Sequence, residues 1–203
     1  VSCHAYMEFD GQDIDAARLE NAWNMVQNKH PMLRAKFSED GMQQFMEAPY
    51  SKEITVVDCT KASDDEIEKQ INSLRESRSH RKLKVALGQV AGLALIKLPD
   101  GKSKMILDVD LLVADVASIG IILDDLAVAY ETGKLTPLGS YTFKNYLADQ
   151  ANIDSQRRQE DIEFWKGKVD NMPDLHIVEH LAQRHLVGDA PHKGVADKQH
   201  FIS

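Results

Sequence analysis

The chain opens with a strand-like pattern followed by a helical one. Residues 3–9 alternate around aromatic and small side chains and end at Asp10 and Gly11, which is typical of a strand closed by a turn. A helical period comes next, with Asp13 as its expected N-cap and Pro31 blocking its continuation. We therefore expect a helix that packs one face on a core. The apolar stripe of that helix consists of Leu19, Ala22, Trp23 and Val26.

Two hairpins and one further strand are expected from the β-type runs that follow. Residues 32–38 and 42–47 flank a Glu-Asp-Gly turn, and residues 54–57 form another short apolar run. Residues 90–98 and 104–114 are longer apolar runs joined by the sequence Pro-Asp-Gly-Lys, which suits a tight turn. We expect these two longer runs to pair as antiparallel strands.

Two further helices have clear boundary signals. Ser63, with Glu66 three residues later, forms a capping box, and apolar residues then recur at helical spacing to about Ser79. Beyond Asp115 the apolar period is helical again and ends at Gly133. The second hairpin is therefore followed by a short turn and a helix.

The remaining pattern predicts helical segments and sets the fold class. Thr142 is a candidate cap for a helix over residues 143–147, and a polar stretch separates it from a second helical piece around residues 162–169. No internal repeat or low-complexity segment is present. Mixed strands and helices predict an α/β fold, a two-layer sandwich of mixed sheet and helices.

Composition excludes several classes of protein. The chain has 203 residues, 43% of them hydrophobic, and no run long enough to span a bilayer, so we expect one cytoplasmic domain or lobe. Cys3 and Cys59 fit free thiols. A net charge of −8 argues against nucleic-acid binding, which requires clustered positive charge. The basic run at residues 75–84 is interpreted as a solvated helix end, or otherwise as a contact for an acidic protein.

Two carboxylates lie inside an apolar strand. With a period of two, Asp108 and Asp110 share one face of the run 104–114, and apolar side chains occupy the other face. A buried, ionised and unpaired Asp110 would cost about 3 kcal/mol or more, so a cation or several donors must meet it. We expect Arg34 to be this partner, because its planar guanidinium matches a carboxylate bidentately.

Asp115 and Ser118 stand where this strand gives way to a helix. Either side chain could cap the unpaired amides of the helix, where the dipole also favours negative charge. Helix caps are common and general bases are rare, so we favour a structural role over a directly catalytic one.

Asp110, Asp115 and Ser118 occupy the fixed positions of the pattern DxxxxDxxS. With its surroundings, this pattern resembles that of heterocyclization domains, the relatives of condensation domains in nonribosomal peptide synthetases. The chain is similar to the N-terminal lobe of such a domain over nearly its whole length. Three other segments match in order and spacing, namely His30–Ala35 (HPMLRA), Ser79–Arg81 (SHR) and Phe164–Pro173.

The resemblance implies one lobe of a chloramphenicol-acetyltransferase-like fold, with residues 1–173 as the lobe and residues 174–203 as an inter-lobe or loosely ordered tail. It implies condensation of an acyl thioester with cysteine, serine or threonine, followed by cyclodehydration to a thiazoline or oxazoline, as in siderophore biosynthesis. Phosphopantetheine on upstream and downstream peptidyl carrier proteins would hold both substrates, and no cofactor is expected to bind the chain directly.

The same resemblance bears on individual residues. It implies a buried ion pair between Asp115 and Arg34, with Asp110 similarly held, which competes with the pairing of Asp110 and Arg34. The catalytic residues of cyclization are expected in the C-terminal lobe of the same domain. No residue of this lobe is therefore expected to be catalytic, and the lobe alone is expected to be inactive.

Two departures from the family leave an alternative open: the opening LTPxQxAYxxGR segment has no counterpart, and the C-terminal lobe is absent. Separately, Asp110 and Leu111 stand where a condensation domain carries its two histidines. Histidine-based condensation is therefore disfavoured. A non-catalytic carrier-docking or structural module is the alternative, and carrier binding without turnover would distinguish it.

Metal-binding and histidine-based sites are further alternatives. His176, Glu179 and His180 form an HxxEH string that could bind zinc on a helix, but little chain follows to supply a third ligand. We therefore expect no metal site. His30 is interpreted as a helix terminator and His80 as an exposed or packing residue.

Overall fold

The computed structural model describes residues 3–169 of the chain. The chain divides into a compact unit that ends at Ser140 and a second unit that begins at Tyr141. The boundary expected at residue 173 lies outside the described residues. None of the helices within residues 3–169 is both long and apolar enough to cross a membrane.

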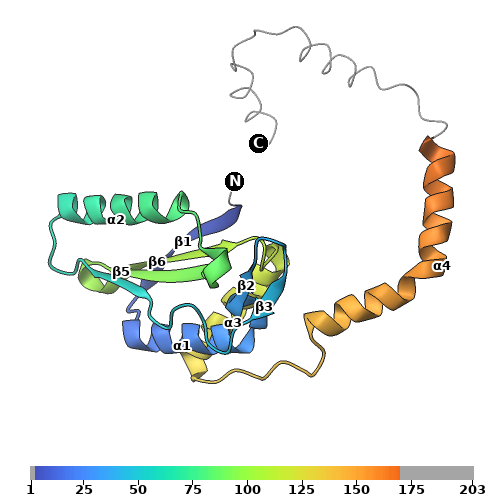
Figure 1. Ribbon diagram of the computed structural model, residues 1–203. Helices are drawn as coiled ribbons and strands as arrows, with labels where there is room; N and C mark the ends of the chain where they lie inside the picture. Colours follow the sequence, from blue (N-terminus) through green and yellow to red (C-terminus); the bar gives the residue numbers. More distant parts are fainter. Residues whose placement is uncertain (1–2, 170–203) are drawn as a thin grey trace, which may run out of the picture. The chain divides into compact units, whose positions relative to one another are not determined.

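A mixed four-stranded sheet forms the centre of the first unit (Figure 1). Its spatial order is β1-β6-β5-β4, in which β6 pairs antiparallel with β1 and β5, and β4 pairs parallel with β5. The expected hairpin of residues 90–98 and 104–114 is thereby confirmed. The strands are β1 (His4–Gln12), β4 (Thr55–Asp58), β5 (Ala91–Lys97) and β6 (Lys102–Asp110).

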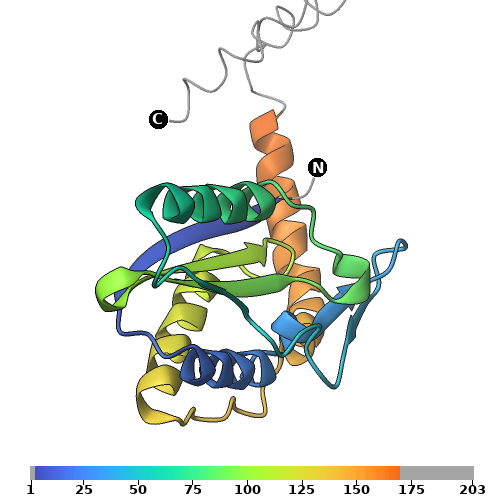
Figure 2. The same ribbon diagram turned by 90° about the vertical axis from the view of Figure 1, so that its left-hand side faces the viewer.

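Helices cover both faces of this sheet. Figure 2 shows α2 (Asp64–Ser79) on one side, and α1 (Ala16–Lys29) and α3 (Val116–Thr132) on the other. The expected α/β class with a mixed sheet is confirmed, and the helices on both faces make three layers where two were expected. Both faces are covered because β5 has apolar side chains on both of its sides, Leu93 and Leu95 in one cluster and Ala94 and Ile96 in the other, and covering each side removes apolar surface from water.

Two separate hydrophobic clusters fill the spaces between the layers. The larger lies under α1 and α3 and includes the expected helix stripe Leu19, Ala22, Trp23 and Val26. The smaller lies under α2 and is formed by Cys59, Ala94, Ile96 and Ile106, with Ile67, Ile71 and Leu74 of the helix packed against it.

The ends of the helices show which local signals operate. Ser63 and Glu66 form the expected capping box of α2, and Gly133 ends α3 in the left-handed conformation. The expected N-cap of α1 at Asp13 is wrong, because Asp15 accepts the amide hydrogen of Arg18 instead. Asp13 lies in the preceding turn with φ 53°.

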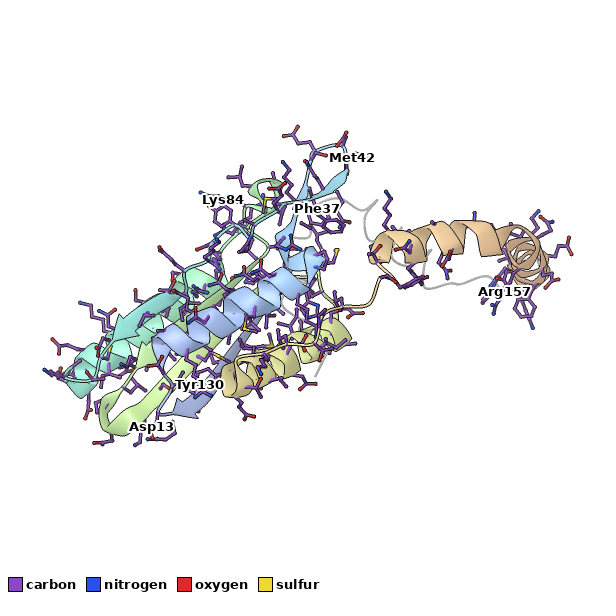
Figure 3. All side chains as sticks on the ribbon, turned by 90° about the horizontal axis from the view of Figure 1, so that it is seen from below. Asp13, Phe37, Met42, Lys84, Tyr130 and Arg157 are labelled. Atoms are coloured by element: carbon purple, nitrogen blue, oxygen red, sulfur yellow. The ribbon has the colours of Figure 1, made fainter. Side chains whose placement is uncertain are left out.

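A small hairpin extends the first unit at one end. Strands β2 (Ala35–Phe37) and β3 (Gln43–Phe45) pair antiparallel, so the expected hairpin is confirmed, although residues 31–34 form a 3₁₀ helix rather than strand. Figure 3 shows Phe37 and Met42 at this end of the unit, together with Lys84, and Asp13 and Tyr130 at the opposite end.

The second unit contains one long helix, α4 (Phe143–Val169), where two helical pieces were expected. Thr142 accepts the amide hydrogen of Asn145 at 3.3 Å, as expected of a cap. The polar stretch between the two apolar segments contains no proline or glycine to end the helix, so helix-forming residues continue through it.

Candidate functional site

The candidate site lies where β6 ends and α3 begins. Side chains alternate along β6, so Ile106, Asp108 and Asp110 face α2, while Leu107 and Val109 pack on the side of α1 and α3. This end of β6 is buried throughout. Its two carboxylates therefore need partners inside the protein, because an unpaired buried charge is costly.

Asp108 has no exposure to solvent and is held by two arginines. Arg78, in the last turn of α2, donates from Nη1 to Oδ1 at 2.5 Å. Arg81, just after α2, donates from Nε to Oδ2 at 2.8 Å, and its Nη2 donates to the same oxygen. We call this group of Asp108, Arg78 and Arg81 the Asp108 clamp. It joins the C-terminal end of α2 to the end of β6.

Arg78 is also anchored to the other strands. Its Nη2 donates to Thr55 Oγ1 of β4 at 2.9 Å and to the carbonyl oxygen of Leu93 in β5 at 3.3 Å. Burial lowers the pKa of the Arg78 guanidinium, and the charge of Asp108 opposes that shift. Arg78 is thus a fixed point between helix and sheet, and Arg81 has Asp108 as its hydrogen-bond partner.

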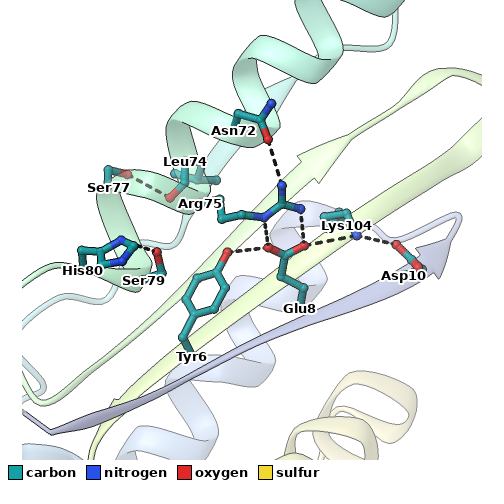
Figure 4. Close-up of polar contacts among 10 residues, drawn as sticks. All are labelled: Tyr6, Glu8, Asp10, Asn72, Leu74, Arg75, Ser77, Ser79, His80 and Lys104. Carbon is teal, nitrogen blue, oxygen red and sulfur yellow. Dashed lines mark hydrogen bonds and ion pairs between the residues drawn. The ribbon is translucent and has the colours of Figure 1, made fainter. Parts of the chain in front are cut away.

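A second arginine–carboxylate group joins α2 to the sheet, as Figure 4 shows. Arg75 donates to both carboxylate oxygens of Glu8, at 2.6 and 2.9 Å, and the Tyr6 hydroxyl donates to Glu8 at 2.7 Å. The hydrogen bonds from Arg75 lower the pKa of Glu8 to about 2, and burial together with Glu8 raises the pKa of Tyr6 to about 12. Lys104 lies 3.4 Å from Glu8 and 2.8 Å from Asp10.

These contacts correct the interpretation of residues 75–84 as a solvated helix end. Arg75, Arg78 and Arg81 recur every three residues, so they share one side of the chain, and that side faces the carboxylates of the sheet. Sequence composition alone does not distinguish such a side from an exposed one, because both contain the same charged residues.

Asp110 is 3% exposed and closes β6. Its Oδ1 accepts the amide hydrogen of Leu112 at 3.0 Å, and its carbonyl oxygen accepts the amide hydrogen of Val113 at 3.1 Å. Its own amide donates to the carbonyl oxygen of Val90 at 2.8 Å. Asp110 therefore shapes the turn between β6 and α3.

Asp115 is the N-cap of α3. One carboxylate oxygen accepts the amide hydrogen of Ser118 at 2.8 Å and its hydroxyl hydrogen at 2.7 Å. These hydrogen bonds lower the pKa of Asp115. Both residues thus take part in the helix cap that the strand-to-helix transition predicted.

Arg34 does not take the expected position. Within residues 3–169 it forms no ion pair with Asp110, the partner expected from charge burial, or with Asp115, the partner implied by the family resemblance. The 3₁₀ helix turns its side chain back toward the end of α1, whose last carbonyl oxygens lack helical donors. The guanidinium donates to the carbonyl oxygens of Gln27, Asn28, Met46 and Glu47.

His30 ends α1, as expected, and also joins it to α3. Its Nε2 lies 2.6 Å from Asp125 Oδ2, and Lys29 Nζ lies 2.8 Å from Asp125 Oδ1. His80 is exposed, with its Nδ1 2.9 Å from the Ser79 hydroxyl. His176, Glu179 and His180 lie outside the described residues, and residues 3–169 contain no cluster of acidic, histidine and cysteine side chains suited to a metal.

A surface pocket of about 350 Å³ adjoins the end of β6. One wall comes from the segment after α2 and another from the turn after β6. Most of its lining side chains are apolar, so the pocket suits a mainly apolar group. The lining residues are Cys3, Lys82, Leu83, Val85, Asp110, Leu111 and Leu112. A second pocket, of about 420 Å³, lies at the opposite end of β6 and contains no residue of the DxxxxDxxS pattern.

The Asp108 clamp is the part of the site that sequence reasoning missed. One available signal was the spacing of Arg78 and Arg81 at the C-terminal end of a helix. Another was Gly92, an interruption in an apolar strand, since glycine in a strand often marks a close approach of other groups. A Cβ at Gly92 would stand 2.5 Å from Arg81 Nη2 and 3.2 Å from Arg78 Nη1.

The sequence of this chain is similar to segments of known peptide synthetases. A family model described as the condensation domain matches residues 2–198. Pyochelin synthetase PchE of Pseudomonas aeruginosa is 37% identical over 175 residues, which cover 86% of this chain and 12% of that protein. Phenyloxazoline synthase MbtB of Mycobacterium tuberculosis is 32% identical over 179 residues, again 86% of this chain and 12% of that protein. The chain thus spans a small part of the length of either synthetase.

The fold is likewise similar to that of solved structures. The cyclization-docking bidomain of the nonribosomal peptide synthetase EpoB from Sorangium cellulosum superposes with a TM-score of 0.76 and 29% sequence identity. The match covers 85% of this chain and 35% of that one. The resemblance to one lobe of a chloramphenicol-acetyltransferase-like fold is therefore confirmed.

Proposed function

Because the chain belongs to the condensation-domain family, which it matches over residues 2–198, we propose that it is the N-terminal lobe of a heterocyclization domain. In this proposal, the complete domain condenses a carrier-bound acyl group with carrier-bound cysteine, serine or threonine. The side chain of that amino acid then closes on the new amide, and loss of water gives a thiazoline or oxazoline.

One observation carries the proposal, namely the junction between β6 and α3. Asp110, Asp115 and Ser118 of the DxxxxDxxS pattern are joined there by hydrogen bonds to the turn and to the helix N-terminus. The position of the first condensation-domain histidine is occupied by buried Asp110. The names of the relatives support ring formation, since one is a phenyloxazoline synthase and another structure is a cyclization bidomain.

The roles of the individual residues in this proposal are structural. Asp110 and Asp115 hold the turn and the start of α3, Ser118 completes the cap, and none of them transfers a proton to substrate. The C-terminal lobe of the same domain supplies the catalytic residues, and the two lobes together enclose a tunnel through which both carrier-bound substrates reach them. Upstream and downstream peptidyl carrier proteins present both substrates on phosphopantetheine arms that enter the tunnel. The phosphopantetheine is attached to the carrier proteins and is not a cofactor of this chain.

The test compares the lobe alone with the complete domain. With both carriers loaded, the two-lobed domain of the parent synthetase is expected to form a product that has lost one water relative to the linear amide, as detected by mass spectrometry. The same assay with residues 1–203 alone is expected to give no ring, because half of the tunnel is missing.

Two results would contradict the proposal. Ring formation by residues 1–203 alone would show that the chain is catalytically complete. Carrier binding by the two-lobed domain, without condensation of either substrate, would instead identify a non-catalytic docking module.

A further inference from the structure

The Asp108 clamp lies directly beside both walls of the pocket at the end of β6. Arg81 immediately precedes the wall segment that contains Lys82 and Leu83, and Asp108 is two residues before Asp110 in the other wall. The hydrogen bonds between Arg81 and Asp108 therefore connect the two walls through very little intervening chain. A change in this connection changes the distance between the walls.

The two arginines of the clamp are held differently. Arg78 is 6% exposed and is bonded to three strands, so it anchors α2 regardless of the pocket. Arg81 has a side chain that is 25% exposed, and its hydrogen bonds go to Asp108. Loss of Arg81 therefore mainly displaces the wall segment that follows it. Arg78 still holds α2 to the sheet.

We propose that Arg81 is a positioning residue that sets the width of this pocket and so the size of the group that the pocket accepts. A planar guanidinium that donates from two nitrogens fixes both the distance and the angle of the following segment, which a single ammonium does not. We take the occupant of the pocket to be the apolar part of a tethered acyl or aminoacyl group, and this identification rests on the proposed function. The effect of Arg81 on the width of the pocket is independent of the proposed function.

Arg75 provides a matched control. It also forms a two-nitrogen pair with a sheet carboxylate, that of Glu8. Glu8 pairs with Ile106, four residues before Asp110 along β6, which is about 13 Å from the pocket at the usual rise of a strand. Loss of the Arg75 pair therefore loosens α2 without acting on the pocket walls.

Cys3 supplies a reporter within the chain. It is exposed and lines the pocket, whereas Cys59 is buried and lies in the cluster under α2. Movement of the pocket walls changes the surroundings of the Cys3 thiol, so the alkylation rate of Cys3 by iodoacetamide reports that movement. The experiment uses residues 1–203 with Arg81→Lys, Arg81→Met and Arg75→Lys, each first checked for a native circular dichroism spectrum.

We expect both Arg81 variants to alkylate Cys3 at least about twofold faster than the wild type, because the wall segment moves away, with Arg75→Lys unchanged. Arg81→Lys keeps the charge, so its effect reports geometry, and either Arg81 variant suffices if the other does not fold. Equal rates in all four proteins, or the same change in Arg75→Lys as in the Arg81 variants, would overturn the proposal.

A second measurement tests the occupant. In the two-lobed domain, Arg81→Lys is expected to change the ratio of kcat/KM for a small and a bulky acyl donor about tenfold, with Arg75→Lys leaving this ratio unchanged. An unchanged ratio alongside faster Cys3 alkylation would show that Arg81 sets the pocket width and that the acyl group binds elsewhere. Absence of any ring product from the wild-type domain would count against the proposed function alone.

Discussion

The carboxylate of Asp108 is fully buried in the sheet. It is stabilised there by ion pairs with the guanidinium groups of Arg78 and Arg81. Removing one partner of such a group leaves the other charge buried without compensation, which is strongly destabilising. The space for both guanidinium groups depends on Gly92, which has no Cβ to fill it. Gly92, which has no side chain to donate or accept a hydrogen bond, is thus required for the site.

Gly92→Ala is expected to lower the free energy of unfolding by about 1–3 kcal/mol, the usual cost of overpacking. The added methyl group would displace Arg81 and Arg78 from Asp108. Urea denaturation followed by circular dichroism measures the change. Gly120→Ala in α3 is the control, since nothing lies within 4 Å of its Cβ and alanine favours a helix, so this variant should be equally stable or more stable. Equal stability of both variants would contradict the packing argument.

The pair of Glu8 and Arg75 is expected to contribute a pH-dependent stability. The pKa of Glu8 is lowered in the folded protein from 4.5 to about 2, so its stabilisation is complete above the unfolded value and is lost as the pH falls toward the folded one. Tm measured from pH 2 to 7 for the wild type and Glu8→Gln should differ by a constant amount above about pH 5. The difference should shrink as the pH falls from 4.5 to 2. A difference independent of pH would show that the charge of Glu8 is not responsible.

At the scale of secondary structure, local patterns predicted most of the elements. The apolar stripe of α1, the capping box of α2 and the end of α3 at Gly133 were all read correctly, since each depends on residues within one or two helical turns. The N-cap of α1 was misplaced by two residues. The reason is that the Asp13 amide bonds to Gly101, a partner distant in sequence, and keeps Asp13 in the turn.

Asp115→Ala is expected to lower the Tm, because the amide of Ser118 at the start of α3 loses its acceptor. Asp115→Asn should recover most of the loss, since asparagine is also a good N-cap. Differential scanning fluorimetry of residues 1–203 measures both. In the two-lobed domain, turnover should fall along with Tm. Lost turnover in Asp115→Ala with an unchanged Tm would instead assign Asp115 a direct role in the chemistry.

At the scale of the whole molecule, the chain belongs to the condensation-domain family and divides after Ser140. The first unit contains both hydrophobic clusters, the Asp108 clamp and the pocket. It therefore has the features of an independently folding unit, since the burial that stabilises it is internal.

Residues 1–140 alone are expected to unfold cooperatively, with a denaturation midpoint close to that of residues 1–203. The reason is that the sheet and its covering helices are complete within this segment. Trp165→Phe in residues 1–203 leaves Trp23, which is buried in the larger cluster, as the tryptophan of both chains, and its fluorescence during chemical denaturation measures the midpoint for this unit. A broad transition, or a midpoint far below that of the longer chain, would show that residues beyond 140 contribute to the same folding unit.

The sequence by itself determined the order and type of most of the elements, the α/β class, the cap at Asp115 and the family. These depend on periodicity, caps and motif spacing, all of which operate over short stretches of chain. Only the tertiary structure decided which charges meet. Arg78 and Arg81 bind Asp108 across 30 and 27 residues of sequence, whereas Arg34 turns back to the end of α1. Any arginine is chemically suited to pair with any buried aspartate. Which arginine pairs with Asp108 therefore depends on the sheet register and on the packing of α2, because these bring Arg78 and Arg81 close to it.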